Sequence, residues 1–461
     1  MKALNVLLVT YSFPPVGGVG VLRAASLARY LPAEGIRLDV LTARNPSAVG
    51  SDPTLLNEIP AEVTIHRTLT LDLPFGVKKA IKKLITSGKA TAIQASQKAS
   101  PGKPNFLKRA FQDLLLPDPQ VTWLPVLTRV ARRIVKARSI DLVLITVPPF
   151  SSMLLVEKLR KDFPQLPIVL DLRDEWITTG SKLSGFSRSE KARAVARKTE
   201  ATAVANSTAV VTVTEAARLE IRSRYPLEQE SKFKLVPNGF DATRLPRSVL
   251  PPPRADGKIV VSYIGSVYES TEPTTLAEAV QSLPPEVKSR FTLRFIGYIE
   301  EPRYREALLQ LGNMVELIGF LPQSEALAAM NQTDYVLLVT HDPLNVSAKF
   351  YDYIGAGKPI LATVHPHGEV RDMIENLRVG WWAASRDAEG IRRLFLEAAA
   401  RGNSPIAEFH PDNGKISQYE RKVIAQRYAH LLRSIANQAI ANENGTQAAE
   451  AGPAQAPGAR P

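Results

Sequence analysis

Two successive series of short apolar runs, each separated from the next by a helical pattern, constrain the fold of this 461-residue chain most strongly. The runs are rich in Val, Ile and Leu and lack polar alternation, as expected of parallel strands buried on both faces. The first series comprises Leu4–Val9, Leu38–Leu41, Leu142–Val147, Ile168–Leu170 and Ala209–Val213. The second comprises Ile259–Ile264, Phe291–Ile296, Val315–Ile318, Tyr335–Val339 and Pro359–Thr363.

Two such series predict two doubly wound α/β domains, because a chain of this length exceeds the usual size of a single core. We expect an N-terminal Rossmann-like domain over residues 1–247, a proline-rich linker over 248–257 and a C-terminal Rossmann-like domain over 258–415. A helix over 416–440 is expected to return to the N-terminal domain. The tail 441–461, which is rich in Ala, Gly, Pro and Gln, is expected to be disordered. The two domains should face a central cleft, with ligands beyond the carboxyl ends of the strands.

Composition excludes several classes of function. The chain has no cysteine, which rules out disulfide scaffolds, thiol nucleophiles and Cys-ligated zinc or iron–sulfur sites and suits the cytoplasm. The first apolar run is followed at once by prolines and glycines, so it is too short for a signal peptide. No stretch approaches the ~18 uninterrupted apolar residues of a spanning helix, so any membrane contact is expected to be peripheral.

The formal charge of +13 is concentrated in one segment. Between Lys78 and Arg138 there are fourteen Lys or Arg residues and two Asp residues, a net charge of +12. Within Val77–Ile85, apolar residues recur at helical spacing and four lysines occupy the opposite face, as in cationic helices that lie on anionic membranes. We therefore expect residues 76–138 to form a basic insertion that associates with the inner face of the cell membrane. The alternative is a helix packed on its own domain with a solvated lysine face.

Nucleic acid is not expected as a partner, since no interleaved pattern of aromatic residues and glycine accompanies this charge. No histidine falls in a metal-ligand spacing, including His365 and His367, which flank a proline. We therefore predict no bound metal and no cofactor.

The most specific motif is Ser347–Ile360, with the sequence SAKFYDYIGAGKPI. A polar loop that contains Asn345 and Val346 leads into a short helix carrying Lys349 and Asp352, which share a face because they are three residues apart. Unpaired N–H groups at a helix N-terminus and a lysine both favour an anion, so a diphosphate site is expected here. The alternative is an ordinary amphipathic helix on which Lys349 and Asp352 form a weak surface pair.

This motif resembles the nucleotide-binding signature of glycosyltransferase family 4, whose members have the GT-B fold and retain anomeric configuration. The resemblance covers about residues 4–435. It implies that Asp352 binds the ribose hydroxyls and that Lys349 lies against the diphosphate of a nucleotide-sugar donor. Family members often carry a carboxylate eight positions before this acidic residue, which contacts the donor sugar. Here that position is Leu344, so the identity of the sugar is left open.

Three further loops resemble parts of the family's substrate sites. The first loop, with Gly17, Gly18 and Gly20, would approach the donor phosphates or the acceptor, although a simple turn fits equally well. Gly265 and Ser266 would lie beside the phosphates. Phe320 and Leu321 belong to a loop that would recognise the base through its backbone, or that is a plain turn after a strand. The element Val236–Asp241 matches the family's Pro-Asn-Gly element and is interpreted as an architectural turn.

The chain departs from the family pattern at two places. Many relatives have an arginine and a lysine shortly after the glycine that corresponds to Gly265, whereas Glu269–Glu272 occupies that stretch here. Lys349 would then carry more of the leaving-group stabilisation. In Asp171–Trp176, Arg173 and Asp174 stand where many relatives have His-Asp, as in branches associated with cell-surface polysaccharide assembly. We assign both residues to the active site; the alternative is a structural ion pair.

These observations predict a metal-independent glycosyltransferase of the hexosyltransferase type. It would move a sugar from a nucleoside-diphosphate donor to a lipid-linked or polysaccharide acceptor with retention of configuration. One alternative is a nucleotide-sugar epimerase of the same fold, which would need no acceptor. Another is a non-catalytic nucleotide-sugar-binding protein, which would never release nucleoside diphosphate.

Overall fold

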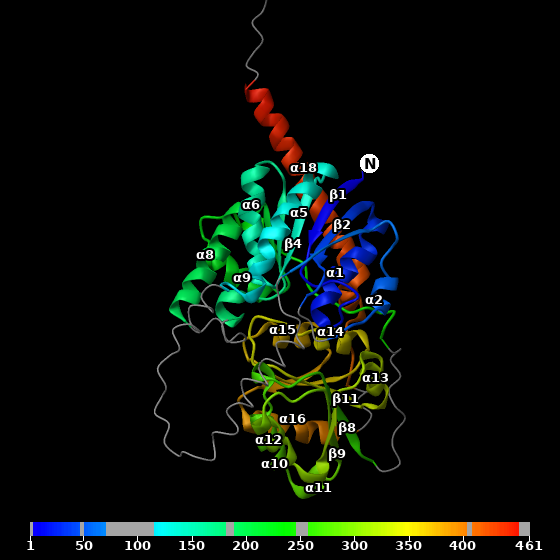
Figure 1. Ribbon diagram of the computed structural model, residues 1–461. Helices are drawn as coiled ribbons and strands as arrows, with labels where there is room; N and C mark the ends of the chain where they lie inside the picture. Colours follow the sequence, from blue (N-terminus) through cyan, green and yellow to red (C-terminus); the bar gives the residue numbers. More distant parts are fainter. Residues whose placement is uncertain are drawn as a thin grey trace, which may run out of the picture. The chain divides into compact units, whose positions relative to one another are not determined.

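The computed structural model describes residues 3–46, 50–70, 115–180, 189–245, 257–402 and 408–450 (Figure 1). Internal contacts divide the chain into two units. The N-unit comprises Met1–Thr212, Ile221–Val236 and Ala425–Pro461, and the C-unit comprises Val213–Glu220 and Pro237–Ile424. The change of unit at Val236 precedes the expected linker, of which residues 248–256 lie outside the described part of the chain.

The N-unit is built on a parallel sheet in the order β3-β2-β1-β4-β5-β6-β7. Its strands are β1 (Leu4–Val9), β2 (Ile36–Ala43), β3 (Thr64–Thr68), β4 (Leu142–Val147), β5 (Ile168–Leu172), β6 (Ala209–Thr212) and β7 (Phe233–Leu235). Each neighbouring pair is parallel, and β4 is buried along its whole length, which explains its unbroken apolar sequence. The order reverses between β1 and β4, so the loops that follow these two strands diverge at the carboxyl edge.

The C-unit repeats this plan with a parallel sheet in the order β10-β9-β8-β11-β12-β13. Its strands are β8 (Ile259–Ile264), β9 (Phe291–Ile296), β10 (Val315–Gly319), β11 (Tyr335–Val339), β12 (Ile360–Val364) and β13 (Gly380–Ala384). The order reverses between β8 and β11. The prediction of two doubly wound α/β sheets is therefore confirmed.

Helices connect the strands and cover the sheets (Figure 1). In order along the chain they are α1 (Val19–Tyr30), α2 (Thr54–Asn57), α5 (Leu124–Ala137), α6 (Leu154–Asp162), α8 (Glu190–Asn206), α9 (Glu215–Arg224), α10 (Thr274–Gln281), α11 (Pro285–Lys288), α12 (Pro302–Leu309), α13 (Gln323–Ala328), α14 (Ala348–Gly355), α15 (Glu369–Leu377), α16 (Ala388–Arg401), α17 (Asn413–Ile416) and α18 (Arg421–Glu450). Helix α6 packs between α5 and α8.

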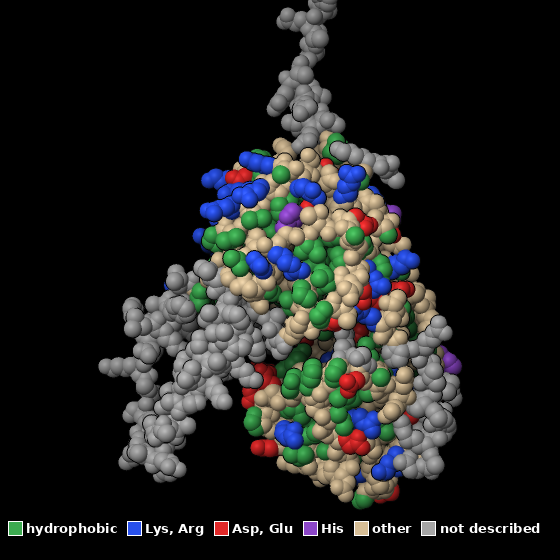
Figure 2. Space-filling model, turned by 45° about the vertical axis from the view of Figure 1, so that its right-hand side comes forward, with side chains coloured by type: hydrophobic (Ala, Val, Ile, Leu, Met, Phe, Trp, Pro, Cys, Tyr) green, Lys and Arg blue, Asp and Glu red, His purple; other side chains and the backbone are tan. Residues whose placement is uncertain are grey.

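Helix α5 is the described end of the basic segment expected at residues 76–138. Leu127, Ala131 and Ile134 are buried, whereas the basic residues of α5 are exposed, so the helix is amphipathic with a cationic outer face. Figure 2 shows Lys and Arg side chains distributed over the visible surface of the N-unit. The predicted cationic helix at Val77–Ile85 lies outside the described residues.

The last helix differs from the expectation at both ends. The stretch expected from residue 416 begins with the short helix α17, and α18 itself runs from Arg421 to Glu450. The expectation of disorder from residue 441 is therefore corrected for residues 441–450, which are helical. A helix that is already docked can be extended without the cost of a new nucleus, even by a weakly apolar sequence. Residues 451–461 lie outside the described part.

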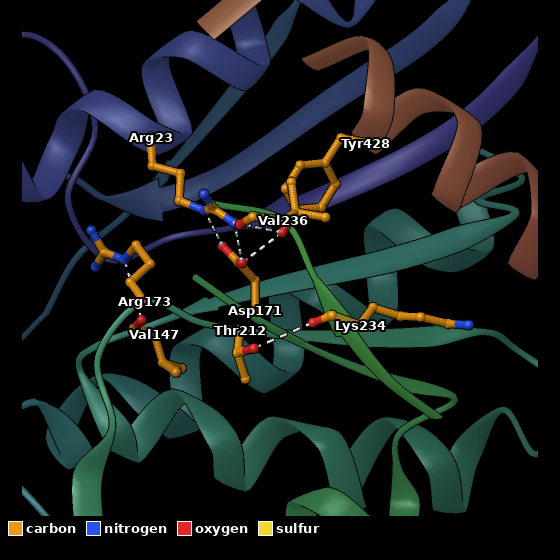
Figure 3. A network of polar contacts seen from close by, with 8 residues as sticks. All are labelled: Arg23, Val147, Asp171, Arg173, Thr212, Lys234, Val236 and Tyr428. Carbon is orange, nitrogen blue, oxygen red and sulfur yellow. Dashed lines mark hydrogen bonds and ion pairs between the residues drawn. The ribbon is translucent and has the colours of Figure 1, made fainter. Parts of the chain in front are cut away.

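A buried polar network joins α18 to the centre of the N-unit (Figure 3). Arg23 on α1 donates to both carboxylate oxygens of Asp171, at 3.0 and 2.9 Å, and to the carbonyl of Val236 at 2.8 Å. The hydroxyl of Tyr428 on α18 donates to Asp171 at 2.5 Å. Burial alone would raise the pKa of Asp171, but the charge of Arg23 and these hydrogen bonds hold it below its ordinary value. The carboxyl group therefore stays ionised in the interior.

Replacing Asp171 by Asn should destabilise the N-unit by about 3–5 kcal/mol, because it leaves the Arg23 cation buried without its counter-charge. Tyr428→Phe removes the hydroxyl that donates to Asp171 and accepts from Arg23 at 3.2 Å, and the loss of these two hydrogen bonds to charged groups should cost at least about 1.5–3 kcal/mol. Hydrogen exchange of the β4 and β5 amides measures the opening free energy of this unit separately from the other.

The matched control is Glu190→Gln on α8. It breaks exposed ion pairs with Arg193 and Arg197 and should leave the exchange rates unchanged. Because the pKa of Asp171 is depressed, its stabilisation should be fully present above about pH 4 and should be lost only in stronger acid. Equal exchange rates for Asp171→Asn and the control would show that this network does not hold the unit together.

Candidate functional site

Lys349 lies at the carboxyl edge of the C-unit sheet, beside the end of β8. Its Nζ is 2.5 Å from the hydroxyl of Tyr263 and 3.9 Å from the centre of that ring. A Cβ atom added to Gly265 would stand 3.1 Å from both Cε and Nζ of the lysine. The structure therefore brings together Lys349 and Gly265, two residues that the sequence assigned to one diphosphate site.

The ammonium group of Lys349 has few partners. Within the described part of the chain, no carboxylate lies within ion-pair distance of it, and its hydrogen-bond partner is the neutral Tyr263. Burial lowers the pKa of Lys349 from 10.5 to about 7. An anionic ligand placed here would restore the counter-charge and would raise the pKa again.

Helix α14 holds Lys349 in place through its buried face. Phe350, Tyr351 and Ile354 are buried in the core of the C-unit. The hydroxyl of Tyr353 accepts a hydrogen bond from the backbone N–H of Ile264 at 3.0 Å, so α14 is fixed to the end of β8. The lysine is thereby presented on a rigid element rather than on a loop.

Asp352 lies one turn further along α14 and is half-buried. Burial raises the pKa of its carboxyl group to about 6, and the charge of Arg421 opposes this shift. Lys349 and Asp352 are not within ion-pair distance of each other in the described structure. The alternative of a weak surface pair between them is therefore not what the structure contains, and both groups remain available to a ligand.

The loop before α14 is held by its own polar groups. Asp342 accepts hydrogen bonds from the backbone N–H groups of Leu344 and Asn345, at 2.8 and 3.1 Å, and from the Asn345 side chain at 2.9 Å. Val346 is buried in the core of the C-unit. The side chains of the predicted site residues Asn345 and Val346 thus have internal roles, and their backbone groups are what a ligand could meet.

Two glycines allow the loops after β8 and β9 to lie against each other. Gly265 has φ +131° and Gly297 has φ +145°. A Cβ at Gly297 would stand 2.2 Å from the carbonyl oxygen of Gly265, so no other residue fits there without displacing the backbone. Ser266, also predicted to bind substrate, is exposed, and its carbonyl accepts from the Tyr263 hydroxyl at 2.8 Å.

The stretch that replaces the expected basic pair after Gly265 is ordered. Glu269–Thr271 forms a 3-10 turn, and Glu272 lies 3.4 Å from Nε2 of His341. No lysine or arginine belongs to this stretch, and it is the ammonium group of Lys349 that lies against Gly265.

Phe320, a predicted base-binding residue, is 60% exposed and stacks on Tyr298, which is 59% exposed. The neighbouring site residue, Leu321, packs against the core of the C-unit. The sequence reasoning missed Tyr298 and Tyr263. Tyr263 is part of an apolar strand and looks like a core residue, whereas Tyr298 directly follows a strand-end glycine, which could have indicated a position at the carboxyl edge.

In the N-unit, Arg173 joins the loops at the carboxyl edge. Its Nε donates to the carbonyl of Val147 at 3.2 Å, Nη2 donates to that of Pro148 at 2.7 Å, and Nη1 donates to that of Gly20 (Figure 3 shows the first of these bonds). Burial lowers the pKa of Arg173, which the nearby Asp174 opposes. Arg173 therefore holds backbone at three points, a role that its sequence motif did not reveal.

The other members of this motif have separate positions. Asp174 is exposed, whereas Glu175 is fully buried and bonds the backbone N–H groups of Ile177 and Thr178 as well as Arg224, at 2.8 Å. Asp174 is thus the member of the motif whose carboxylate reaches the surface. The assignment of Arg173 and Asp174 to the active site stays a prediction.

The predicted glycine loop lies at the start of α1. Gly17 donates its N–H to the carbonyl of Gly50 at 3.1 Å, Gly18 immediately precedes the helix, and the carbonyl of Gly20 accepts from Arg173. This loop and Arg173 therefore form one connected group at the carboxyl edge of the N-unit.

The Pro-Asn-Gly element has an architectural position in the C-unit. The N–H of Phe240 donates to the carbonyl of Tyr419 at 3.0 Å, and a Cβ at Gly239 would stand 1.9 Å from that carbonyl oxygen. The interpretation of this element as a structural turn agrees with these contacts.

No helix among the described residues is both long and apolar enough to cross a bilayer. No group of three or more His, Cys, Asp or Glu side chains among them is arranged to hold a metal ion. Metal independence stays a prediction.

Each half of the chain matches the model of a known glycosyltransferase domain. Residues 17–239 match the model of the glycosyl transferase 4-like domain, and residues 251–405 match that of glycosyl transferases group 1. The chain is 25% identical over 199 residues to a Pseudomonas aeruginosa protein described as "Probable glycosyltransferase WbjE". That match covers 40% of this chain and 47% of the relative, so it spans about half the relative's length.

Solved structures share the fold. Sucrose-phosphate synthase from Thermosynechococcus elongatus has a TM-score of 0.60 at 14% identity, over 94% of this chain and 99% of that one. The Anabaena protein Alr3699/HepE in complex with UDP has a TM-score of 0.59 at 16% identity, over 94% and 100% of the two chains. Both sheets, both domain matches and these neighbours agree: the fold is GT-B, and the chain belongs to the GT4-type glycosyltransferases.

Proposed function

We propose that this protein transfers a hexose-type sugar from a nucleoside-diphosphate donor to an acceptor hydroxyl, with retention of configuration. The observation that carries this proposal is Lys349, a half-buried cation with no carboxylate at ion-pair distance among the described residues, fixed against Gly265 at the carboxyl edge of the C-unit sheet. A diphosphate is the ligand that such a cation and the adjacent backbone suit best.

In this proposal the C-unit binds the donor. Lys349 contacts the diphosphate, and the carboxylate of Asp352 accepts hydrogen bonds from the ribose hydroxyls. When the bond between the anomeric carbon and the diphosphate oxygen breaks, negative charge accumulates on the leaving group, and Lys349 stabilises it. The reaction proceeds without a covalent intermediate on the enzyme. Its rate enhancement therefore comes from this electrostatic stabilisation and from the positioning of the substrates.

The N-unit would hold the acceptor. Arg173 fixes the Gly17–Gly20 loop relative to the turn at Val147 and Pro148, and the exposed Asp174 lies on the same edge. We therefore assign Arg173 the positioning of the acceptor loop and Asp174 a direct contact with the acceptor.

The acceptor is proposed to be a lipid-linked oligosaccharide used in polysaccharide assembly, reached from the cytoplasmic face of the membrane. The concentration of positive charge in residues 76–138 and the exposed basic face of α5 support contact with an anionic membrane. The similarity to WbjE supports glycosyl transfer, and the UDP held by HepE supports a uridine nucleotide as the first donor to test.

The two alternative functions differ from glycosyl transfer in the products that they would form. An epimerase would convert the nucleotide sugar without any acceptor, so incubation with the donor alone would reveal it. A non-catalytic protein would bind the nucleotide sugar but release no nucleoside diphosphate when an acceptor is added. A thermal-shift screen with UDP-, GDP- and dTDP-sugars would choose the donor, because a ligand at 100 times its Kd stabilises by ~2.7 kcal/mol.

Lys349→Ala should reduce turnover about 10²–10³-fold, since removing one preorganised electrostatic partner of a developing anion costs ~2.7–4 kcal/mol. Asp352→Ala should chiefly weaken donor binding. Release of nucleoside diphosphate, followed at several donor concentrations, separates the two effects.

The matched control for this pair is Lys288→Ala, which removes a half-buried lysine of α11 in the same unit and should leave both parameters unchanged. Near-normal transfer by a folded Lys349→Ala protein would remove the central residue from this mechanism and would favour the non-catalytic alternative.

Donor affinity should depend on pH with a maximum between about pH 6 and 7. Above pH 7 the amine of Lys349 is mostly neutral and must take up a proton to meet the diphosphate, so affinity falls as pH rises. Below pH 6 the carboxyl group of Asp352 is protonated and loses its capacity to accept from the ribose, so affinity falls again. Calorimetric titration with a nucleotide sugar, whose esterified phosphates do not titrate in this range, measures both limbs.

Two variants assign the limbs of this profile. Lys349→Arg should abolish the fall above pH 7, because guanidinium stays charged, and Asp352→Asn should abolish the fall below pH 6. Unchanged limbs in these variants would show that other groups control donor binding.

Changing Lys78, Lys79, Lys82 and Lys83 to Gln should weaken binding to anionic vesicles by several kcal/mol, since each basic residue contributes on the order of 1 kcal/mol near such a surface. Transfer to a water-soluble acceptor should be preserved. Vesicle co-sedimentation in low salt checks this, and undiminished binding would eliminate the membrane role of these lysines.

A further inference from the structure

Three histidines and an arginine gather at the carboxyl edge of the C-unit sheet, on the loops that follow three neighbouring strands. They are His341 after β11, His365 and His367 after β12, and Arg386 after β13. The ring centroids of His365 and His367 are 6.3 Å apart. Burial lowers the pKa of His365, and the other three groups lower it further, so each of them lies within electrostatic range of that ring. The proposed mechanism uses none of these four side chains.

The loops after β11 and β12 pack against each other. The N–H of Glu369 donates to the carbonyl of Pro343 at 3.0 Å. A Cβ at Gly368 would stand 3.2 Å from both the Cα of Pro343 and the Cβ of His365. The N–H of His367 donates to Nδ1 of His365 at 3.2 Å, which assigns the proton of the neutral ring to Nε2. Among the described residues this Nε2 has no acceptor, so it is a donor that a ligand can use.

The carboxylates that neighbour these four residues already accept hydrogen bonds from protein groups. Asp342 accepts the three hydrogen bonds of its own loop. Three others accept from backbone N–H groups at 2.9 to 3.3 Å: Glu272 from Thr274, Glu369 from Glu215 and Ala216, and Asp387 from Gly390. In contrast, Arg386 is exposed and has no ion-pair partner in the described part of the chain. The four residues therefore include a cation whose counter-charge the protein does not supply.

These side chains lie beyond Lys349 on the side away from Asp352. On α14, Asp352 is one turn closer to the C-terminus than Lys349, whereas the loop with His341 enters the helix at its N-terminus. A donor with its ribose at Asp352 and its diphosphate at Lys349 therefore extends its sugar toward the loops after β11 and β12. The strand order β8-β11-β12 places the end of β12 roughly 10 Å from the end of β8, a separation that a sugar linked to the diphosphate can span.

The side chains at this end of the donor suit an anionic sugar better than a neutral one. A carboxylate can accept hydrogen bonds from sugar hydroxyls, but Leu344 offers none and the side chain of Asn345 is bonded to Asp342. Imidazole N–H and guanidinium groups are donors instead. A guanidinium in particular binds a carboxylate through two parallel, charge-assisted hydrogen bonds.

We propose that the sugar of the donor is a hexuronic acid, a hexose whose C6 is a carboxylate. Arg386 binds this carboxylate together with the N–H groups of His365 and His367, and these residues determine the sugar specificity of the chain. The inference rests on the proposed function, because it takes the diphosphate to lie at Lys349 and the ribose at Asp352.

The test compares donors that differ only at C6. Calorimetry on the full-length protein uses UDP-glucose with UDP-glucuronic acid, and the epimeric pair UDP-galactose with UDP-galacturonic acid. In at least one pair the uronic acid should bind about 10- to 100-fold more tightly than the hexose, because it adds hydrogen bonds to a charged group. UDP alone, which lacks the sugar, measures the affinity of the nucleotide part.

Two variants assign this preference to the proposed residues. Arg386→Ala and His367→Ala each remove an exposed side chain, so both proteins should fold normally. Each substitution should reduce the preference for the uronic acid about tenfold and should leave the affinity for UDP unchanged. Arg386→Lys keeps a positive charge and should retain part of the preference. The matched control is Arg393→Ala, which removes another exposed arginine, on α16, and should change no affinity.

The possible failures are distinguishable. Equal affinity for the uronic acid and the hexose in both pairs would overturn the inference, as would a preference that survives in both Arg386→Ala and His367→Ala. A loss in these variants that extends equally to UDP would also overturn it, since the residues would then act on the nucleotide. If UDP does not bind, or if Lys349→Ala binds it as before, the proposed diphosphate site fails instead.

Discussion

Arg23 and Asp171 form a bidentate ion pair inside the N-unit, and the arrangement of the carboxyl edge of this unit depends on it. Two opposite charges can remain in a protein interior only when they pair with each other and their remaining hydrogen-bonding capacity is used. Here the hydroxyl of Tyr428 and the carbonyl of Val236 provide the additional hydrogen bonds. The pair thereby links the first helix, the fifth strand, the end of the seventh strand and the last helix (Figure 3). Because the end of β5 is fixed in this way, the directions of the side chains that follow Asp171 are fixed as well. Arg173 donates to three backbone carbonyls, Glu175 points into the interior, and Asp174 faces solvent.

The C-unit obtains its chemistry from a different constraint, the close approach of Gly265 to the side chain of Lys349. Because the glycine has no Cβ, the ammonium group can lie directly against the backbone. There it is buried and contacts the ring and hydroxyl of Tyr263 rather than a carboxylate. The lowered pKa of Lys349 follows from this environment. An anionic ligand would supply the negative counter-charge that Lys349 lacks. In this way a chain without the usual basic pair after Gly265 can still stabilise a developing negative charge.

The central strands of each sheet could be predicted from the sequence more completely than the edge strands. Leu4–Val9 and Leu142–Val147 were identified to the residue, because strands buried on both faces carry unbroken apolar runs. The edge strands β3, β7 and β13 were missed, because β3 and β13 are only partly buried and β7 has only three residues, so their sequences carry little signal. The same limit applies to the candidate site. The motif around Lys349 was recognised from its spacing together with its resemblance to the family signature. The roles of Tyr263 and Arg173 depend on contacts across 86 and 153 residues that no local pattern encodes.

The central claim is that Lys349 meets the diphosphate of the donor as a protonated amine, and proton uptake on binding tests it most directly. Calorimetric titration of a nucleotide sugar at pH 8, repeated in buffers with different ionisation enthalpies, counts the protons taken up. A lysine whose pKa is about 7 in the free protein is mostly neutral at that pH. The account predicts uptake of nearly one proton per donor bound, and none in Lys349→Arg. Binding without proton uptake by the unmodified protein, or the same uptake in Lys349→Arg, would contradict it.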